Sequence, residues 1–185
     1  AHTGISLDYW DKTKHALTAA AYKTIGDHAT IGVKQLICPW VDAEWRSVDN
    51  LKVLCEILNA FGKACKKEGI QFGYHNHDFE FKKLEGKAIL DHIMMQTDPE
   101  LVIMELDLYW VKFAGEDPVH WINHLGNRIH AYHVKDMAAT EKKESIEVGE
   151  GILDFESLFK LPASSKVKYY IVELEHYRTN SMQGV

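Results

Sequence analysis

Imidazole and carboxylate side chains recur at the ends of four strand-like segments of this chain. His77 lies at the end of the first segment, Asp107 of the second, His133 of the third and Glu173 of the fourth. Imidazole nitrogens and carboxylate oxygens are common ligands of divalent metal ions. Four matched positions favour one shared site, so the sequence predicts a metal centre with these four residues as ligands.

Residues 73–81, Gly-Tyr-His-Asn-His-Asp-Phe-Glu-Phe, contain the first of these ligand candidates. Alternate side chains of a strand share a face, so His75 and His77 point one way and Tyr74 and Asn76 the other. Taken alone, this segment also fits a polar loop that follows a strand, and both interpretations stay open at this point.

The elements that must position these side chains alternate along the chain. Helical spacing of apolar residues predicts helices, and short apolar runs between them predict strands. The expected helices cover residues 11–28, 47–67, 87–96 and 117–126, with a short helix after residue 155. The expected strands cover residues 1–3 (the end of a strand), 32–38, 69–77, 101–108, 128–136 and 168–176, with an extended loop over 137–147.

This alternation favours a parallel sheet covered by helices. Polar groups gathered at the C-terminal strand ends are typical of the active face of a (β/α) barrel. Glu105 and Asp107 are two residues apart and share a face, as do His133 and Lys135. Acids within an apolar strand are rarely buried unless they are paired or bound to metal, which makes Asp107 a functional candidate.

Composition excludes several classes of function. The 185 residues are 46% hydrophobic and 26% charged with a formal net charge of −6, which predicts one globular domain over residues 1–185. The acidic balance argues against a nucleic-acid partner, and no apolar run is long enough to suggest a membrane partner. The three cysteines, Cys38, Cys55 and Cys65, are odd in number, so we expect thiols in a reducing cytoplasm.

Several motifs together resemble the sugar phosphate isomerase/epimerase family, whose fold is the xylose-isomerase-like TIM barrel. The matching segments are residues 73–81, 105–110, 133–136, 149–151 with 154–155, and 172–173. The resemblance covers most of the chain and implies the fold class α/β, a (β/α)8 TIM barrel. Such barrels run to about 250 residues, so we expect a partial barrel that lacks the first two strands and the last helix.

The resemblance implies one divalent metal ion, Mn²⁺, Mg²⁺, Co²⁺ or Zn²⁺. Asp107, His133 and Glu173 match the family's Asp, His and last Glu. Many members have a Glu as their first metal ligand. At that place this chain has His77, which we expect to be the ligand, with Glu80 as the alternative.

The resemblance also implies proton transfer beside a metal-bound carbonyl of a keto-sugar or sugar phosphate, through an enediolate. Glu173 or Glu175 would abstract the proton, and the second acid/base would be Glu80, Glu175 or Lys135. Lys135 also suits stabilisation of an oxyanion or binding of an anionic substrate; by position alone it equally fits an ordinary lysine at a strand end.

His75, Trp40, Tyr109 and Trp110 are the predicted substrate-binding residues, and core packing is the alternative for the aromatic ones. The expected partner is a small sugar, and a homo-oligomer is possible.

Three other functions stay open. The same groups allow a dehydratase of a keto-polyol such as an inosose. A nuclease like endonuclease IV would need more ligands and a basic groove, which the acidic composition disfavours. A non-catalytic sugar- or metal-binding relative would keep the fold without the first Glu.

Overall fold

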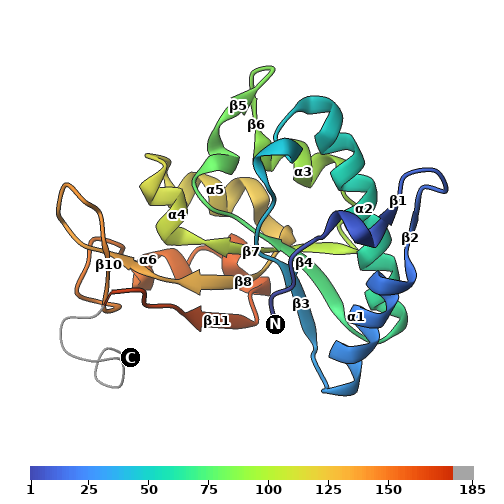
Figure 1. Ribbon diagram of the computed structural model, residues 1–185. Helices are drawn as coiled ribbons and strands as arrows, with labels where there is room; N and C mark the ends of the chain where they lie inside the picture. The colour runs from blue at the N-terminus through green and yellow to red at the C-terminus, as the bar shows by residue number, and fades with distance from the viewer. Residues whose placement is uncertain (177–185) are drawn as a thin grey trace. The chain divides into compact units, whose positions relative to one another are not determined.

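The structure is a computed structural model in which residues 1–176 are described (Figure 1). Its contacts divide the chain into two compact units. The first unit comprises residues 1–76 and 82–103, and the second comprises residues 77–81 and 104 onward.

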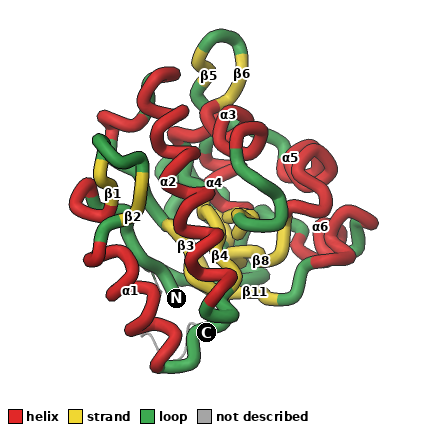
Figure 2. Tube along the Cα trace, turned by 90° about the vertical axis from the view of Figure 1, so that its right-hand side faces the viewer, coloured by secondary structure: helices red, strands yellow, loops and turns green. Residues whose placement is uncertain are grey.

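The first unit contains a parallel strand pair covered by helices. Its elements are η1 (Leu7–Tyr9), β1 (Trp10–Asp11), β2 (Ala16–Leu17), α1 (Ala19–Thr30), β3 (Gln35–Cys38), η2 (Ala43–Trp45), α2 (Val48–Lys67), β4 (Gln71–His75), β5 (Lys83–Leu84), β6 (Lys87–Ala88) and α3 (Ile89–Gln96). Strands β3 and β4 are parallel, and α2 packs against β4. Figure 2 shows the helices in red and the strands in yellow.

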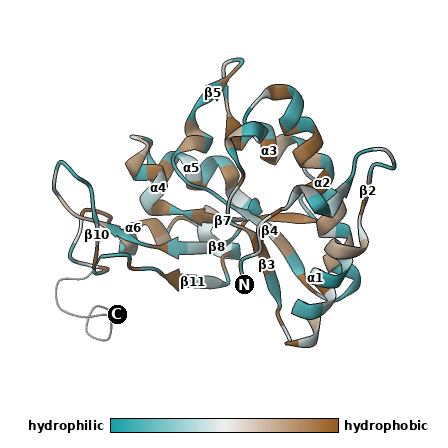
Figure 3. Cartoon of the chain, in the orientation of Figure 1, coloured by the Kyte–Doolittle hydropathy of each residue, from teal (hydrophilic) through white to brown (hydrophobic). Residues whose placement is uncertain are grey.

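Helix α2 forms as the sequence predicts. Its apolar residues recur every three or four positions and are buried, whereas hydrophilic residues lie between them (Figure 3). The Ser47 side chain accepts a hydrogen bond from the backbone N–H of Asn50, which caps the helix. The expected strand end at residues 1–3 is also confirmed, because His2 pairs in parallel with Ile37 of β3.

The helix expected over residues 11–28 is wrong in its first half. Residues 10–17 form the β1–β2 hairpin, and the helix begins only at Ala19. The Asp11 carboxylate accepts backbone N–H bonds from Thr13 and Lys14, which stabilises a turn instead of a helix. His15 has a φ of 48°, which a right-handed helix does not accommodate.

The second unit contains three parallel strands. Its elements are η3 (Phe79–Phe81), β7 (Val102–Asp107, in this unit from Met104), α4 (Leu108–Phe113), α5 (Pro118–Leu125), η4 (Gly126–Arg128), β8 (Ile129–Val134), β9 (Asp136–Met137), β10 (Ser145–Ile146), α6 (Phe155–Phe159), η5 (Pro162–Lys166) and β11 (Tyr169–Val172). Both β7 and β11 pair with β8 in parallel.

Two sequence predictions need correction in this unit. The extended loop expected over residues 137–147 contains part of a small antiparallel pair, β9–β10. The strand expected to reach His176 ends at Val172. After Glu173, the backbone N–H of Glu175 donates to the Ser145 hydroxyl and no longer follows the strand ladder.

Alternating helices and parallel strands confirm the α/β fold class. Within residues 1–176 there are five parallel strands, whereas a TIM barrel has eight. No helix in this part of the chain is long and apolar enough to cross a membrane. Cys38, Cys55 and Cys65 are all buried, and none of them forms a disulfide within residues 1–176.

Candidate metal and catalytic site

The register of the second unit's strands brings the acids and the imidazole together. Asp107 of β7 pairs with His133 of β8, and His133 pairs with Ile171 of β11. Neighbours in register share a face, and so do residues two apart on a strand. Glu105, Asp107 and His133 therefore lie on one face of this sheet, while Lys135 and Glu173 follow the ends of β8 and β11.

His133 is the centre of this cluster. Its Nδ1 lies 2.7 Å from Glu173 Oε2 and 3.8 Å from Asp107 Oδ2. Its Nε2 lies 3.1 Å from Glu105 Oε1. One ligand atom from each of Asp107, His133 and Glu173 lies within 4.8 Å of the others. Three of the four predicted ligands are thus adjacent in the structure.

The cluster contains more negative charge than positive charge. Burial raises the pKa of Asp107 to about 7, despite its hydrogen bond from the Trp110 N–H and the nearby His133. Burial acts to lower the pKa of His133, but hydrogen bonds to Glu105 and Glu173 and the charges of Glu105 and Asp107 raise it to about 9. For Asp107, loss of hydration on burial outweighs the stabilising effect of the neighbouring positive charges.

The residues present therefore fit a divalent cation. Two carboxylates and one imidazole are suitable ligands, and a bound cation would stabilise the ionised form of the Asp107 carboxylate. Glu105 is the residue that sequence reasoning left out of the site. Its position two residues before Asp107, on the same strand face, was the signal that could have identified it.

His77 is not among the three adjacent ligands. It belongs to the short segment that ends in η3, and its ring packs 5.3 Å from that of Trp110 and stacks 6.2 Å from that of Phe79. Its backbone N–H donates to Glu80 Oε2 at 2.8 Å. Glu80 is fully buried, and this hydrogen bond to its Oε2 stabilises the turn. Both residues stay candidates for the first ligand.

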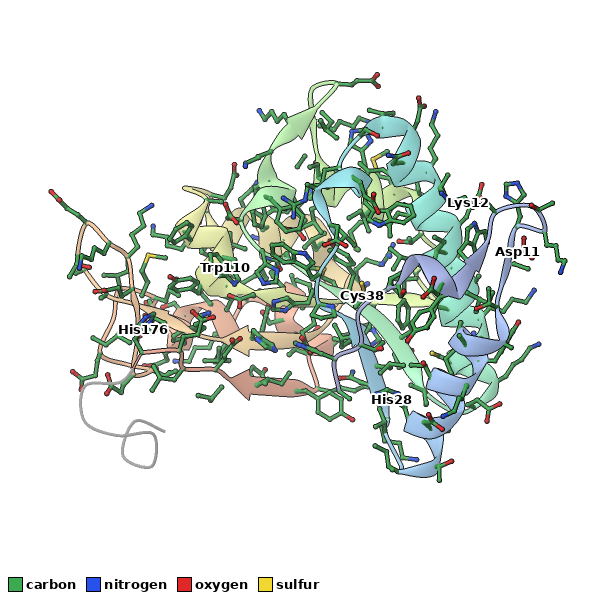
Figure 4. The ribbon with its side chains drawn as sticks, in the orientation of Figure 1. Asp11, Lys12, His28, Cys38, Trp110 and His176 are labelled. Atoms are coloured by element: carbon green, nitrogen blue, oxygen red, sulfur yellow. The ribbon has the colours of Figure 1, made fainter. Side chains whose placement is uncertain are left out.

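Lys135 lies beside the cluster and is fully buried. Its Nζ is 2.7 Å from Glu175 Oε1 and 3.8 Å from Glu173 Oε1. The same Nζ lies 4.8 Å from the ring centre of Tyr109 and 5.0 Å from that of Trp110, which is labelled in Figure 4. Two carboxylates and two aromatic faces therefore surround one ammonium group.

The other predicted substrate-binding residues belong to the first unit. His75 is buried in β4, with its ring 5.4 Å from that of His2. Trp40 is 45% exposed, and its indole N–H donates to Asp42 while the Arg46 guanidinium lies 5.1 Å over its ring. Tyr74, predicted to lie on the opposite strand face from His75, is fully buried, as is usual for a core residue.

The first unit also contains a cavity of about 330 Å³ that includes none of the predicted site residues. It is lined by Trp10, Lys12, His15, Glu44, Trp45, Asn50 and Val53. A cavity alone does not make a catalytic site, whereas the second unit gathers acids, an imidazole and a buried ammonium group. The second unit is therefore the stronger candidate.

Comparison with known proteins agrees with this architecture. The family described as xylose isomerase-like TIM barrel matches residues 4–184. A crystal structure of a sugar phosphate isomerase/epimerase from Parabacteroides distasonis ATCC 8503 is 31% identical, with a TM-score of 0.82, over 99% of this chain and 65% of that one.

An inosose dehydratase from Mesomycoplasma hyopneumoniae strain J is 30% identical over 135 residues, or 71% of this chain. The chain spans 44% of that relative's length. The crystal structure of an IOLI protein with a binding zinc atom is 15% identical to this chain, with a TM-score of 0.63. The match covers 84% of this chain and 59% of the IOLI chain, and at this identity it shows a shared fold alone. The matched family and the strand–helix architecture together place this chain in the xylose isomerase-like TIM barrel family.

Proposed function

We propose that this chain carries the metal and proton-transfer site of an enzyme that acts beside the carbonyl of a keto-sugar or sugar phosphate. The observation that carries the proposal is the cluster of Asp107, His133 and Glu173. These three residues would hold one divalent ion, with His77, Glu80 or Glu105 as a fourth ligand. A divalent ion bound there would act as a Lewis acid that makes the C–H beside the carbonyl more acidic.

The remaining residues suit the handling of the proton. Glu175 has a carboxylate that is 48% exposed, and that of Glu173 is 36% exposed, so either carboxylate can meet a substrate from solvent. Lys135 lies next to both and orients them. We propose Glu175 as the base, because Glu173 is assigned to the metal and Glu175 is the more exposed of the two carboxylates.

Two outcomes of this chemistry are supported by relatives. Isomerases and epimerases return the proton to the substrate, which agrees with the structural relative from Parabacteroides distasonis. Dehydratases instead expel a hydroxyl group as water, which agrees with the curated inosose dehydratases. Both reactions begin by removing a proton beside a carbonyl, so the same residues serve either one.

Proton exchange with solvent tests the proposal. The full chain, loaded with Mn²⁺ or Zn²⁺, is incubated in D₂O with a keto-sugar, a sugar phosphate or an inosose, and deuterium incorporation and loss of water are followed by NMR and mass spectrometry. We expect exchange that Glu175→Gln lowers by roughly 100-fold or more. The matched control is Glu156→Gln, an exposed acid paired with Lys160.

Each result has a distinct meaning. Exchange with rearranged product supports an isomerase or epimerase, and exchange with loss of water supports a dehydratase. A metal-loaded protein without exchange on any of the three substrates contradicts the enzymatic proposal.

Metal analysis of single variants identifies the ligands. We expect Asp107→Ala and His133→Ala to lose the metal. Parallel measurements on His77→Ala, Glu80→Gln and Glu105→Gln then decide the fourth ligand. Unchanged metal content in both Asp107→Ala and His133→Ala contradicts the proposed centre.

A further inference from the structure

Asp136 joins four points of one loop in the second unit. Its side chain is fully buried. Oδ1 accepts backbone N–H bonds from Met137 and Leu153, at 2.8 and 3.1 Å, and Oδ2 accepts them from Gly149 and Gly151, at 3.0 and 3.1 Å. One carboxylate therefore ties the two ends of the loop 137–153 together. This carboxylate belongs to the residue that directly follows Lys135.

The two glycines of this loop are explained by the same carboxylate. A Cβ on Gly151 would collide with the Asp136 carboxylate, so only glycine brings its N–H this close. Gly149 has a φ of 93°, a conformation that L-residues rarely adopt. The two glycines of the Gly-Glu-Gly motif at residues 149–151 are thus both required by the Asp136 carboxylate and the turn around it.

One side of this loop supports helix α4, which carries Tyr109 and Trp110. The Tyr109 hydroxyl donates to the backbone carbonyl of Lys143 at 2.7 Å. The Lys143 ammonium donates to the carbonyl of Phe113 at 3.1 Å, at the end of the same helix. The loop therefore fixes the aromatic face against which the Lys135 ammonium lies.

Another part of the loop holds the acidic partner of Lys135. The Ser145 hydroxyl accepts the backbone N–H bonds of Glu175 and His176, each at 3.1 Å. His176 is labelled in Figure 4. Ser145 is buried, so this contact is shielded from water. The Glu175 carboxylate in turn lies 2.7 Å from Lys135.

We propose that Asp136 is a positioning residue: by closing residues 137–153 it holds Tyr109 and Glu175 against the Lys135 ammonium. The role of Lys135 and Glu175 in proton transfer rests on the proposed function. The structural link from Asp136 through the loop to the contacts of Lys135 does not. The Asp136 carboxylate is hydrogen-bonded to the backbone of this loop, and we assign its effect on Lys135 to the loop.

Chemical labelling of Lys135 tests the link without an activity assay. The full chain is treated with a limiting amount of acetic anhydride, and acetylation of each lysine is measured by mass spectrometry. Lys135 should react more slowly than exposed lysines because it is fully buried. Asp136→Asn replaces one acceptor oxygen by an NH₂ group, so we expect the labelling rate of Lys135 to rise roughly tenfold through local opening.

Two matched controls distinguish local exposure of Lys135 from a loss of stability of the whole protein. Asp154→Asn changes an acid that caps α6 and is outside the Asp136 network, so Lys135 should label as in the wild type. Gly151→Ala should reproduce Asp136→Asn, whereas Gly4→Ala, where a Cβ meets nothing within 4 Å, should not. Equal Lys135 labelling in the wild type, Asp136→Asn and Gly151→Ala overturns the proposal.

A gentler variant covers the case in which Asp136→Asn does not fold. Ser145→Ala removes only the acceptor for Glu175 and His176, and it should raise both Lys135 labelling and hydrogen exchange at the Glu175 amide. The exposed Ser165→Ala is its control. If Ser145→Ala changes neither quantity, the link from the loop to Lys135 is refuted.

The proton-exchange assay then separates this proposal from the proposed function. If both hold, Asp136→Asn lowers the exchange rate constant and leaves metal content unchanged. If the wild type shows no exchange but Asp136→Asn still exposes Lys135, the link stands and the proposed function fails. If the wild type exchanges protons and Asp136→Asn alters neither labelling nor exchange, the link fails alone.

Discussion

We expect the metal-free protein to lose stability as the pH rises from about 6.5 to about 9. In the folded chain, hydrogen bonds to Glu105 and Glu173 outweigh burial and raise the pKa of His133 from 6.5 to about 9. Within that window the folded state holds a proton that the unfolded state has released. The stabilisation is complete below pH 6.5 and is lost as the pH passes 9.

The magnitude follows from the width of the window. Each unit of pKa shift corresponds to about 1.4 kcal/mol, so the free energy of unfolding should fall by about 3 kcal/mol. Asp107 contributes the same sign at lower pH, because burial raises its pKa from 3.8 to about 7 and the folded state holds its proton between those values. The decline should therefore begin well below neutral pH and continue above it.

Urea denaturation in EDTA at half-unit pH steps measures this slope. In His133→Asn the decline between about pH 7 and 9 should be much shallower, whereas His120→Asn, at an exposed position of α5, should behave like the wild type. Adding Mn²⁺ or Zn²⁺ should reverse the slope, since protons compete with the metal for these ligands. A wild-type curve that is flat over this window would refute the reasoning.

Further predictions concern packing and thiol reactivity. Gly62→Ala should destabilise the chain by about 1–3 kcal/mol, since its Cβ would collide with the Leu101 backbone. Gly26→Ala, where a Cβ in α1 meets nothing within 4 Å, should stabilise the chain by up to about 1 kcal/mol. Thermal unfolding of both variants measures these changes, and a Gly62→Ala variant as stable as the wild type would contradict the close approach. Burial raises the pKa of Cys55 and Cys65 to about 12, so both thiols should react with Ellman's reagent only on unfolding, and rapid reaction of the folded protein at pH 8 would contradict this burial.

The parts of the fold that the sequence predicted are those in which apolar residues repeat regularly over a short stretch of chain. Helix α2 repeats its apolar residues over 20 positions and has a capping serine, so its bounds were found almost to the residue. The adjacency of Asp107, His133 and Glu173 followed from their common place at strand ends, because parallel strands in register bring such positions together.

The parts that sequence missed depend on side-chain contacts with distant backbone groups. The Asp136 carboxylate binds N–H groups up to 17 residues away, and no spacing rule connects those positions in advance. The hairpin at residues 10–17 depends on the Asp11 carboxylate, which accepts the N–H groups that a helix would have used. Glu105 was visible as an acid in an apolar strand, but its 3.1 Å contact with His133 required the register.

The burial of Lys135 favours a functional role over a structural one. Taking an ammonium group fully out of water is costly, and replacing such ion pairs by apolar side chains is often neutral or stabilising. Its acidic partners, Glu173 and Glu175, are themselves partly exposed, so they would be solvated without it. The fold thus keeps a cation where packing alone does not require one, beside an acid-rich cluster that suits a divalent metal. A buried charge of this kind is expected at functional sites, where a residue needed for the reaction is kept although it lowers the stability of the fold.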